Sequence, residues 1–122
     1  MFIPTFEDLR IWLYNSNLIN MAHLGARAFE DIGGEVVQTT AFVLCKNSTK
    51  NYRGSYVKLT DFGSQDLKEK AFLQKKDCLT YHIVKEKYLN VPSNIYVYWI
   101  NDAIFNAFLQ SKISDKLEQK QV

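Results

Sequence analysis

The alternation of apolar and polar positions along the chain predicts interleaved helices and strands. Apolar residues at helical spacing predict a first helix that begins at Thr5, whose hydroxyl would cap it, and that ends at the polar run 15–17. A short apolar run over Leu18–Leu24, closed by Gly25, predicts a strand. The stretch Glu35–Cys45 is rich in Val and Thr and predicts the longest strand of the chain.

The second half of that long strand, Ala41–Cys45, is a continuous apolar run instead of an alternation. Such a run is typical of a strand covered on both faces, so we expect a central position in a sheet and strong protection of residues 36–44. Replacing Phe42 with Asp should then abolish folding. Residues 26–32 leave room for a turn or two of helix before this strand, and the glycine pair 33–34 favours a tight turn.

The remaining elements are shorter or less regular. A strand at Ser55–Leu59 could return antiparallel to the long strand. Further elements are expected as an exposed amphipathic helix at Ser64–Lys76, a short strand at Leu79–Val84 and a helix at Asp102–Gln110. Residues 95–100 fit helix and strand equally, so their state stays open.

Composition narrows the class of protein. The chain has 122 residues, of which 47% are hydrophobic and 14% aromatic, as expected for one small globular domain. The formal charge of +2 is too small to predict nucleic-acid binding unless basic residues cluster locally. The two cysteines lie at no metal-ligand spacing, and the chain shows no secretory signal or membrane-spanning run. We expect a cytoplasmic protein that does not contact a membrane.

Histidines and lysines offer little catalytic chemistry in this sequence. His23 and His82 have no nearby Ser or Cys arrangement, so a structural or surface role is favoured for both. Lysines in the stretches 68–76 and 85–87 alternate with acidic residues, which favours an ordinary solvated surface. The sequence therefore predicts no catalytic residue and no metal site.

A group of basic residues in turns is the best candidate for ligand contact. Its members are Arg27, Lys46, Lys50 and Arg53, with Tyr52 and Tyr56 interleaved. Basic side chains could contact phosphates while the aromatic rings stack on bases. A solvated hairpin loop is an equally good interpretation of the same residues.

Several longer stretches of the sequence resemble a known protein family. The run NMAHLGARAFEDIGGEVVQTTAFVL, at Asn20–Leu44, resembles the corresponding segment of the PglX-type adenine-specific DNA methyltransferases of BREX phage-defence systems. The similarity continues through YRGSYVKLTDF at Tyr52–Phe62 and weakly into Val91–Phe108. The opening FEDLRIWLY resembles the Phe-Glu-x-Leu-Arg helix of that family.

This resemblance implies an α/β fold made of the late strands and helices of a Rossmann-like methyltransferase sheet, incomplete, with a helical C-terminal extension. Residues 1–63 would be the C-terminal part of the methyltransferase core. Residues 64–122 would be a helical connector towards a target-recognition region.

The resemblance also implies a parent enzyme that transfers a methyl group from S-adenosylmethionine to adenine N6 in DNA. The family's glycine-bearing cofactor motif and its Asn-Pro-Pro-Tyr motif have no counterpart in this sequence, so no residue is carried over as catalytic or cofactor-binding. We expect the chain alone to be inactive and to bind no cofactor.

The expected partners of the chain are DNA in the parent enzyme and either the missing N-terminal half or a second copy of the chain. Three alternatives stay open: a stand-alone DNA-binding or protein-interaction module, the partner subunit of a split gene, and a truncated product without function.

Overall fold

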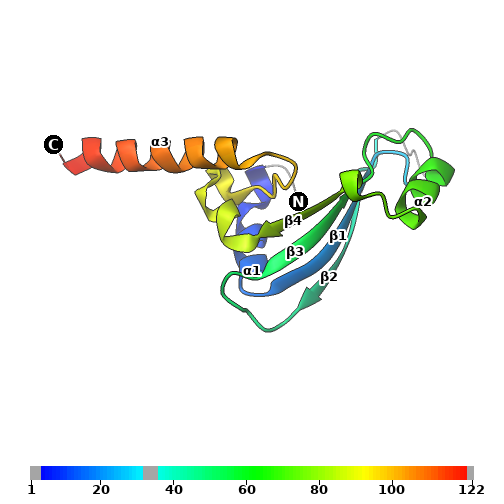
Figure 1. The fold of residues 1–122 in the computed structure, drawn as a ribbon, viewed down its shortest axis with the longest axis horizontal. Helices are drawn as coiled ribbons and strands as arrows, with labels where there is room; N and C mark the ends of the chain where they lie inside the picture. Colours follow the sequence, from blue (N-terminus) through cyan, green and yellow to red (C-terminus); the bar gives the residue numbers. More distant parts are fainter. Residues whose placement is uncertain (1–3, 32–35, 121–122) are drawn as a thin grey trace.

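The computed structural model describes residues 4–31 and 36–120 and has a mixed α/β architecture, as predicted (Figure 1). The α-helices are α1 (Glu7–Tyr14), α2 (Gln65–Leu73) and α3 (Asp102–Lys120), and the strands are β1 (Asn17–Gly25), β2 (Thr39–Cys45), β3 (Arg53–Lys58) and β4 (Thr80–Val84). Short 3₁₀ segments are η1 (Pro4–Phe6), η2 (Asp77–Leu79), η3 (Lys85–Asn90) and η4 (Pro92–Asn94). This arrangement is compatible with an incomplete Rossmann-like sheet.

The strands form one sheet in the order β2-β1-β3-β4. Strand β1 is antiparallel to β2 and parallel to β3, and β4 closes the sheet antiparallel to β3. The strand predicted at Ser55–Leu59 is β3, and it runs antiparallel to β2 as expected. It does not pair with β2, because the β2–β3 loop crosses the start of β1 and places β3 on the other side of that strand. The strands predicted at Leu18–Leu24 and Leu79–Val84 are confirmed as β1 and β4.

A bulge in β1 explains why two residues three positions apart both face the core. Leu18 is 4% exposed and Met21 is 1% exposed, although a regular strand would point them to opposite faces. The β1–β2 register shifts between Leu18 and Asn20, so Ile19 is the extra residue. The bulge therefore gives β1 a core-facing side that simple alternation does not predict.

The predicted central position of the long strand is wrong. Strand β2 lies at the edge of the sheet, and it begins at Thr39 instead of Glu35. Phe42 is 44% exposed and Val43 is 51% exposed, so the predicted burial of this run on both faces is also wrong. The core packs over β1 and β3 and reaches β2 only at Leu44, which leaves the rest of the strand uncovered. Phe42→Asp is consequently not expected to abolish folding.

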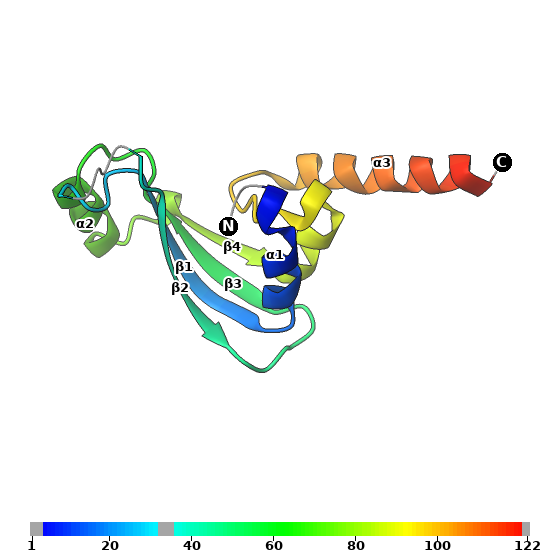
Figure 2. The same ribbon diagram turned by 180° about the vertical axis from the view of Figure 1, so that it is seen from behind.

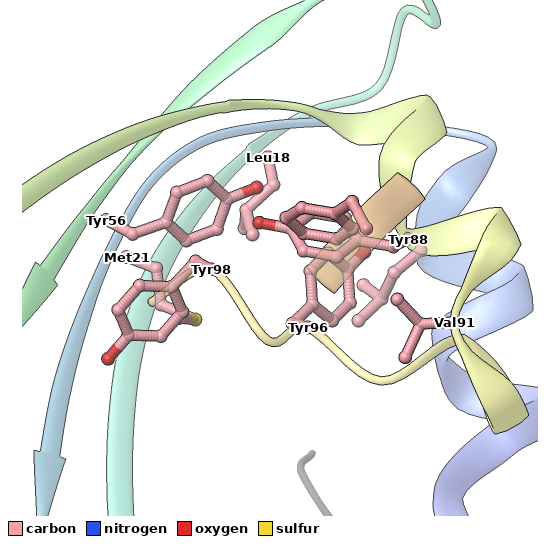
Figure 3. Close-up of a cluster of buried hydrophobic side chains, with 9 residues drawn as sticks. Leu18, Met21, Tyr56, Tyr88, Val91, Tyr96 and Tyr98 are labelled. Carbon is pink, nitrogen blue, oxygen red and sulfur yellow. The ribbon is translucent and has the colours of Figure 1, made fainter. Parts of the chain in front are cut away.

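Tyrosine rings dominate the core on one face of the sheet (Figure 3). Tyr56 and Tyr98 stack with ring centroids 5.3 Å apart, and Tyr88 and Tyr96 meet at 4.7 Å. All four side chains are 1% exposed or less. Residues 95–100 form neither helix nor strand, and this irregular segment inserts every second residue, Tyr96 and Tyr98, into the core.

Helix α1 fixes this irregular segment through buried polar contacts. The Arg10 side chain is fully buried, and its Nε and Nη2 donate to the Ser93 carbonyl at 3.0 and 2.8 Å. The Tyr14 hydroxyl donates to the Asn94 carbonyl at 3.1 Å. Ser93 and Asn94 both have positive φ, at 55° and 50°, a conformation that side-chain-bearing residues rarely adopt without such support.

The ends of the helices differ from the sequence predictions in several places. Thr5 lies inside η1 and caps no helix, since α1 begins at Glu7 without a side-chain cap. Residues 26–31 form turns and bends instead of helix, and the glycine pair 33–34 lies outside the described residues. Helix α2 is capped by Ser64 Oγ, which accepts from the Leu67 N–H at 3.3 Å.

Helix α3 extends to Lys120, ten residues beyond the predicted end at Gln110, because residues 111–120 are mostly polar but favour helix. In both views it runs away from the sheet as a single rod (Figures 1 and 2). The division of the chain at residue 63 stays a prediction, and the sheet takes β4 from beyond that point.

Candidate nucleic-acid interface

The loop between β2 and β3, residues 46–52, is held against the start of β1. The Asn17 side chain bonds Thr49 twice: its Nδ2 donates to Thr49 Oγ1 at 3.1 Å, and its Oδ1 accepts from the Thr49 N–H at 3.0 Å. Asn17 is 4% exposed, whereas Thr49 is exposed, so these bonds are partly buried. They fix the loop where it passes from one side of β1 to the other.

Lys85, at the start of η3, is the second anchor of this loop. Its side chain is nearly buried, with 9% of the residue exposed, and its Nζ donates to Ser48 Oγ at 2.6 Å and Asn17 Oδ1 at 3.2 Å. The carbonyls of Tyr14 and Ser16 lie 3.4 and 3.5 Å from the same nitrogen. A cation at the carbonyl end of α1 is electrostatically favourable, so Lys85 joins that helix to the loop.

The far side of the loop is anchored to η3 as well. The Asn51 N–H donates to Glu86 Oε1 at 2.9 Å, and the Lys85 N–H donates to the Tyr52 carbonyl at 3.1 Å. Asn51 has a φ of 58°, which Asn tolerates better than most residues. The loop therefore has a fixed backbone path, which lowers the entropic cost of presenting its side chains to a ligand.

The anchored loop and the first residue of β3 together carry three of the predicted contact residues. Lys46, Lys50 and Arg53 are exposed, and Lys50 borders a hollow of about 510 Å³ between α1, the loop and η3. Exposed cations on a fixed backbone suit the phosphates of a nucleic acid, which are contacted mainly by Lys, Arg and polar groups. The Glu86 carboxylate beside the loop lowers the local positive potential.

Two predicted contact residues do not belong to this group. Asn17 pairs with Cys45 and Gly25 pairs with Thr39, so Arg27 lies at the opposite end of β1 from the loop. A nine-residue strand spans roughly 30 Å, which is too far for a shared local site. Tyr56 is 1% exposed beneath Tyr98, so the suggestion that it stacks on bases is wrong.

The lysine anchors were not predicted from the sequence. Lys85 and Lys68 were both assigned to ordinary solvated surface, and that assignment is wrong for both. Lys68 is 3% exposed and its Nζ donates to the Leu59 carbonyl at 2.8 Å, while burial lowers its pKa. No spacing pattern marks either residue, since their partners come from other elements.

His23 has the structural role that the sequence favoured. Its Nδ1 lies 2.8 Å from the Tyr98 hydroxyl at the margin of the tyrosine core. Burial, with a smaller effect of the nearby Lys58 charge, lowers the pKa of His23 to about 4. The ring is therefore neutral at pH 7 and serves packing and hydrogen bonding. His82 is exposed on the other face of the sheet.

The described glycines do not form a cradle for S-adenosylmethionine. A Cβ at Gly25 would meet Thr60 at 3.0 Å, and one at Gly54 would meet the Leu18 carbonyl at 2.6 Å. Both glycines thus make room for the chain itself and not for a ligand, and a Cβ at Gly63 would meet nothing within 4 Å. The residues described here do not fit a cofactor site of the glycine-turn type.

The described residues contain neither a metal-binding group nor a membrane-spanning helix. Within residues 4–31 and 36–120, no group of three or more His, Cys, Asp or Glu side chains could hold a metal ion. Over the same ranges, no helix has both the length and the apolar character needed to cross a membrane.

Comparison with known proteins gives two clear relatives. The chain is 44% identical over 103 residues, 81% of its length, to the adenine-specific methyltransferase PglX of Lacticaseibacillus casei (strain Zhang). It is 38% identical over 111 residues, 90% of its length, to the adenine-specific methyltransferase BrxX of Escherichia coli O9:H4 (strain HS). The matched stretch covers 9% of each relative. No protein-family model matches the chain.

The matched stretches cover 81% and 90% of the chain, and they agree with the resemblance seen in the sequence. Over most of its length, the chain is a homologue of one segment of the PglX-type adenine-specific methyltransferases.

Proposed function

We propose that the chain is a segment of a site-specific DNA adenine-N6 methyltransferase of a restriction-modification or phage-defence system. The observation that carries this proposal is the identity of 44% and 38% to two adenine-specific methyltransferases. Because the chain matches only 9% of each relative, the complete reaction needs sequence that the chain does not contain.

In this proposal, cofactor binding and methyl transfer belong to other parts of the enzyme. The family resemblance assigns S-adenosylmethionine and the Asn-Pro-Pro-Tyr motif to sequence without a counterpart here. The packing of Gly25 and Gly54 against the chain itself supports the same division. Titration calorimetry of the chain with S-adenosylmethionine should show no binding, and a one-to-one isotherm would contradict the division.

The contribution of the segment is structural and electrostatic. The β2–β3 loop, fixed by Asn17 and Lys85, presents Lys46 and Lys50, and Arg53 follows at the start of β3. Such a loop suits contacts to the DNA backbone, which position a duplex without reading its sequence. We expect weak binding that depends on salt and not on base sequence.

Fluorescence anisotropy with a short labelled duplex at several salt concentrations tests this loop. Each phosphate contact contributes about 0.9 to the slope of log K against log salt, so Lys50→Gln should reduce the slope by about that amount. Arg27→Gln is the matched control, because it removes the same charge at the other end of β1. Equal effects of the two variants would show that net charge, and not the loop, attracts DNA.

A further inference from the structure

Strand β2 is more apolar than its position in this structure requires. It contains no charged residue and no proline, and its sequence is TTAFVLC. It lies at the edge of the sheet, with Phe42 on one face and Val43 on the other, respectively 44% and 51% exposed. A continuous apolar run is typical of a strand buried on both faces, so this strand has the composition of an interior element.

The edge of β2 also lacks the features that protect free edges. Natural edge strands are usually short or carry Lys, Pro or inward-pointing charges that prevent pairing with another chain. Strand β2 has seven residues and none of those side chains. Among the described strands it pairs with β1 alone, so its other side can accept a further strand.

The sheet face opposite the tyrosine core is open beside this edge. Asn20 pairs with Val43 and Ala22 pairs with Ala41, so these residues share the face that points away from Met21. A hollow of about 680 Å³ lies on this face. Its apolar lining includes Ala22, Ala41, Val43 and Val57 from the strands and Phe72 from α2.

We propose that the free edge of β2 receives a β-strand, and the hollow receives apolar side chains, from a polypeptide that carries the remainder of a PglX-type methyltransferase. This inference rests on the proposed function. In each relative the matched stretch is 9% of the length, so there the same strand is accompanied by a large amount of other sequence. A second copy of this chain fits less well, because edge-to-edge pairing extends a sheet in its own plane and leaves its face open.

The test is capture by a defined partner. The full chain is co-expressed with a tagged copy of the Lacticaseibacillus casei relative from which the 103 matched residues are deleted. The two should co-purify in equal amounts, and hydrogen exchange of the β2 amides should slow in the complex. Val43→Lys, which places a charge on the edge strand, should weaken capture by about tenfold or more.

Ile113→Lys on α3 is the matched control, because Ile113 and Val43 are both 51% exposed. Both variants should fold alone, as judged by thermal melting, and the Ile113 variant should be captured normally. The proposal is overturned if the unaltered chain is not captured, if the two variants lose capture equally, or if Val43 controls only self-association of the chain. Capture that depends on Val43, together with no effect of Lys50→Gln on DNA binding, would uphold docking and refute the DNA contact.

Discussion

Replacing Lys85 with Met should destabilise the protein and loosen the β2–β3 loop. The change keeps most of the side-chain volume and removes the ammonium that holds Ser48 Oγ at 2.6 Å and Asn17 Oδ1 at 3.2 Å. Methionine offers no donor in place of the ammonium, so the carbonyls of Tyr14 and Ser16 also lose a nearby donor.

The magnitude follows from the two shorter bonds. Hydrogen bonds to a charged group contribute about 1.5–3 kcal/mol each to stability, and the desolvation of the buried ammonium offsets part of that sum. Asn17 Oδ1 keeps the Thr49 N–H at 3.0 Å, which limits its loss. We therefore expect the free energy of unfolding to fall by about 2–3 kcal/mol, a large fraction of the ~5–15 kcal/mol typical of a domain.

Urea denaturation followed by circular dichroism measures this change. Lys87→Met is the matched control, because Lys87 lies two residues away and forms an exposed ion pair with Asp102. Removal of such a pair should cost at most about 1 kcal/mol. Hydrogen exchange should also become faster at the Thr49 and Asn51 amides in the Lys85 variant and stay unchanged in the control.

Equal stability of the two lysine variants would refute the anchoring role of Lys85. A destabilised Lys85 variant with unchanged exchange at Thr49 would show that this lysine supports α1 and not the loop.

Four further outcomes follow from the core and the sheet. Because burial lowers the pKa of His23 from 6.5 to about 4, the unfolded state binds more protons between these values, so stability should decrease as the pH falls through this window. Urea midpoints at pH 7 and 4.5 measure this, and His23→Gln should remove that part of the pH dependence. Tyr56→Ala should lower the free energy of unfolding by about 3–5 kcal/mol, whereas Phe42→Asp should leave a cooperatively melting chain. Gly54→Ala should cost about 2 kcal/mol or more on thermal melting, because its Cβ would lie 2.6 Å from the Leu18 carbonyl.

Local sequence signals predicted the positions of several elements well. The apolar run with flanking polar residues located β1, and Ser64 correctly marked the start of α2. These signals depend on neighbours within a few residues. The order of the strands in the sheet does not depend on such close neighbours, so the position of β3 beside β1 was not predicted.

The error over β2 has a different cause. The run Ala41–Cys45 indicates how much apolar surface the strand needs to bury, but it cannot indicate which polypeptide covers that surface. The structure leaves the strand at an edge with Phe42 and Val43 exposed. The apolar run was therefore wrongly interpreted as evidence that other strands of this same chain flank β2.

The candidate site was predicted only in part. Lys46, Lys50 and Arg53 were predicted from their charge and their place in a turn region, and their contact with DNA stays a prediction. Arg27 was grouped with them only because it is near in sequence. Lys85 was missed because its partners Ser48 and Tyr14 lie 37 and 71 residues away. Contacts over such separations leave no spacing pattern.

The proposed function is that of a working segment within a DNA adenine methyltransferase. Its most direct test measures transfer of a labelled methyl group from S-adenosylmethionine to DNA by the Lacticaseibacillus casei relative that lacks the 103 matched residues, with and without this chain. We predict that each polypeptide is inactive alone, that the pair methylates adenine, and that the Val43→Lys chain restores far less activity. A purified complex of the two that methylates no adenine, or methylation by this chain alone, would contradict the claim.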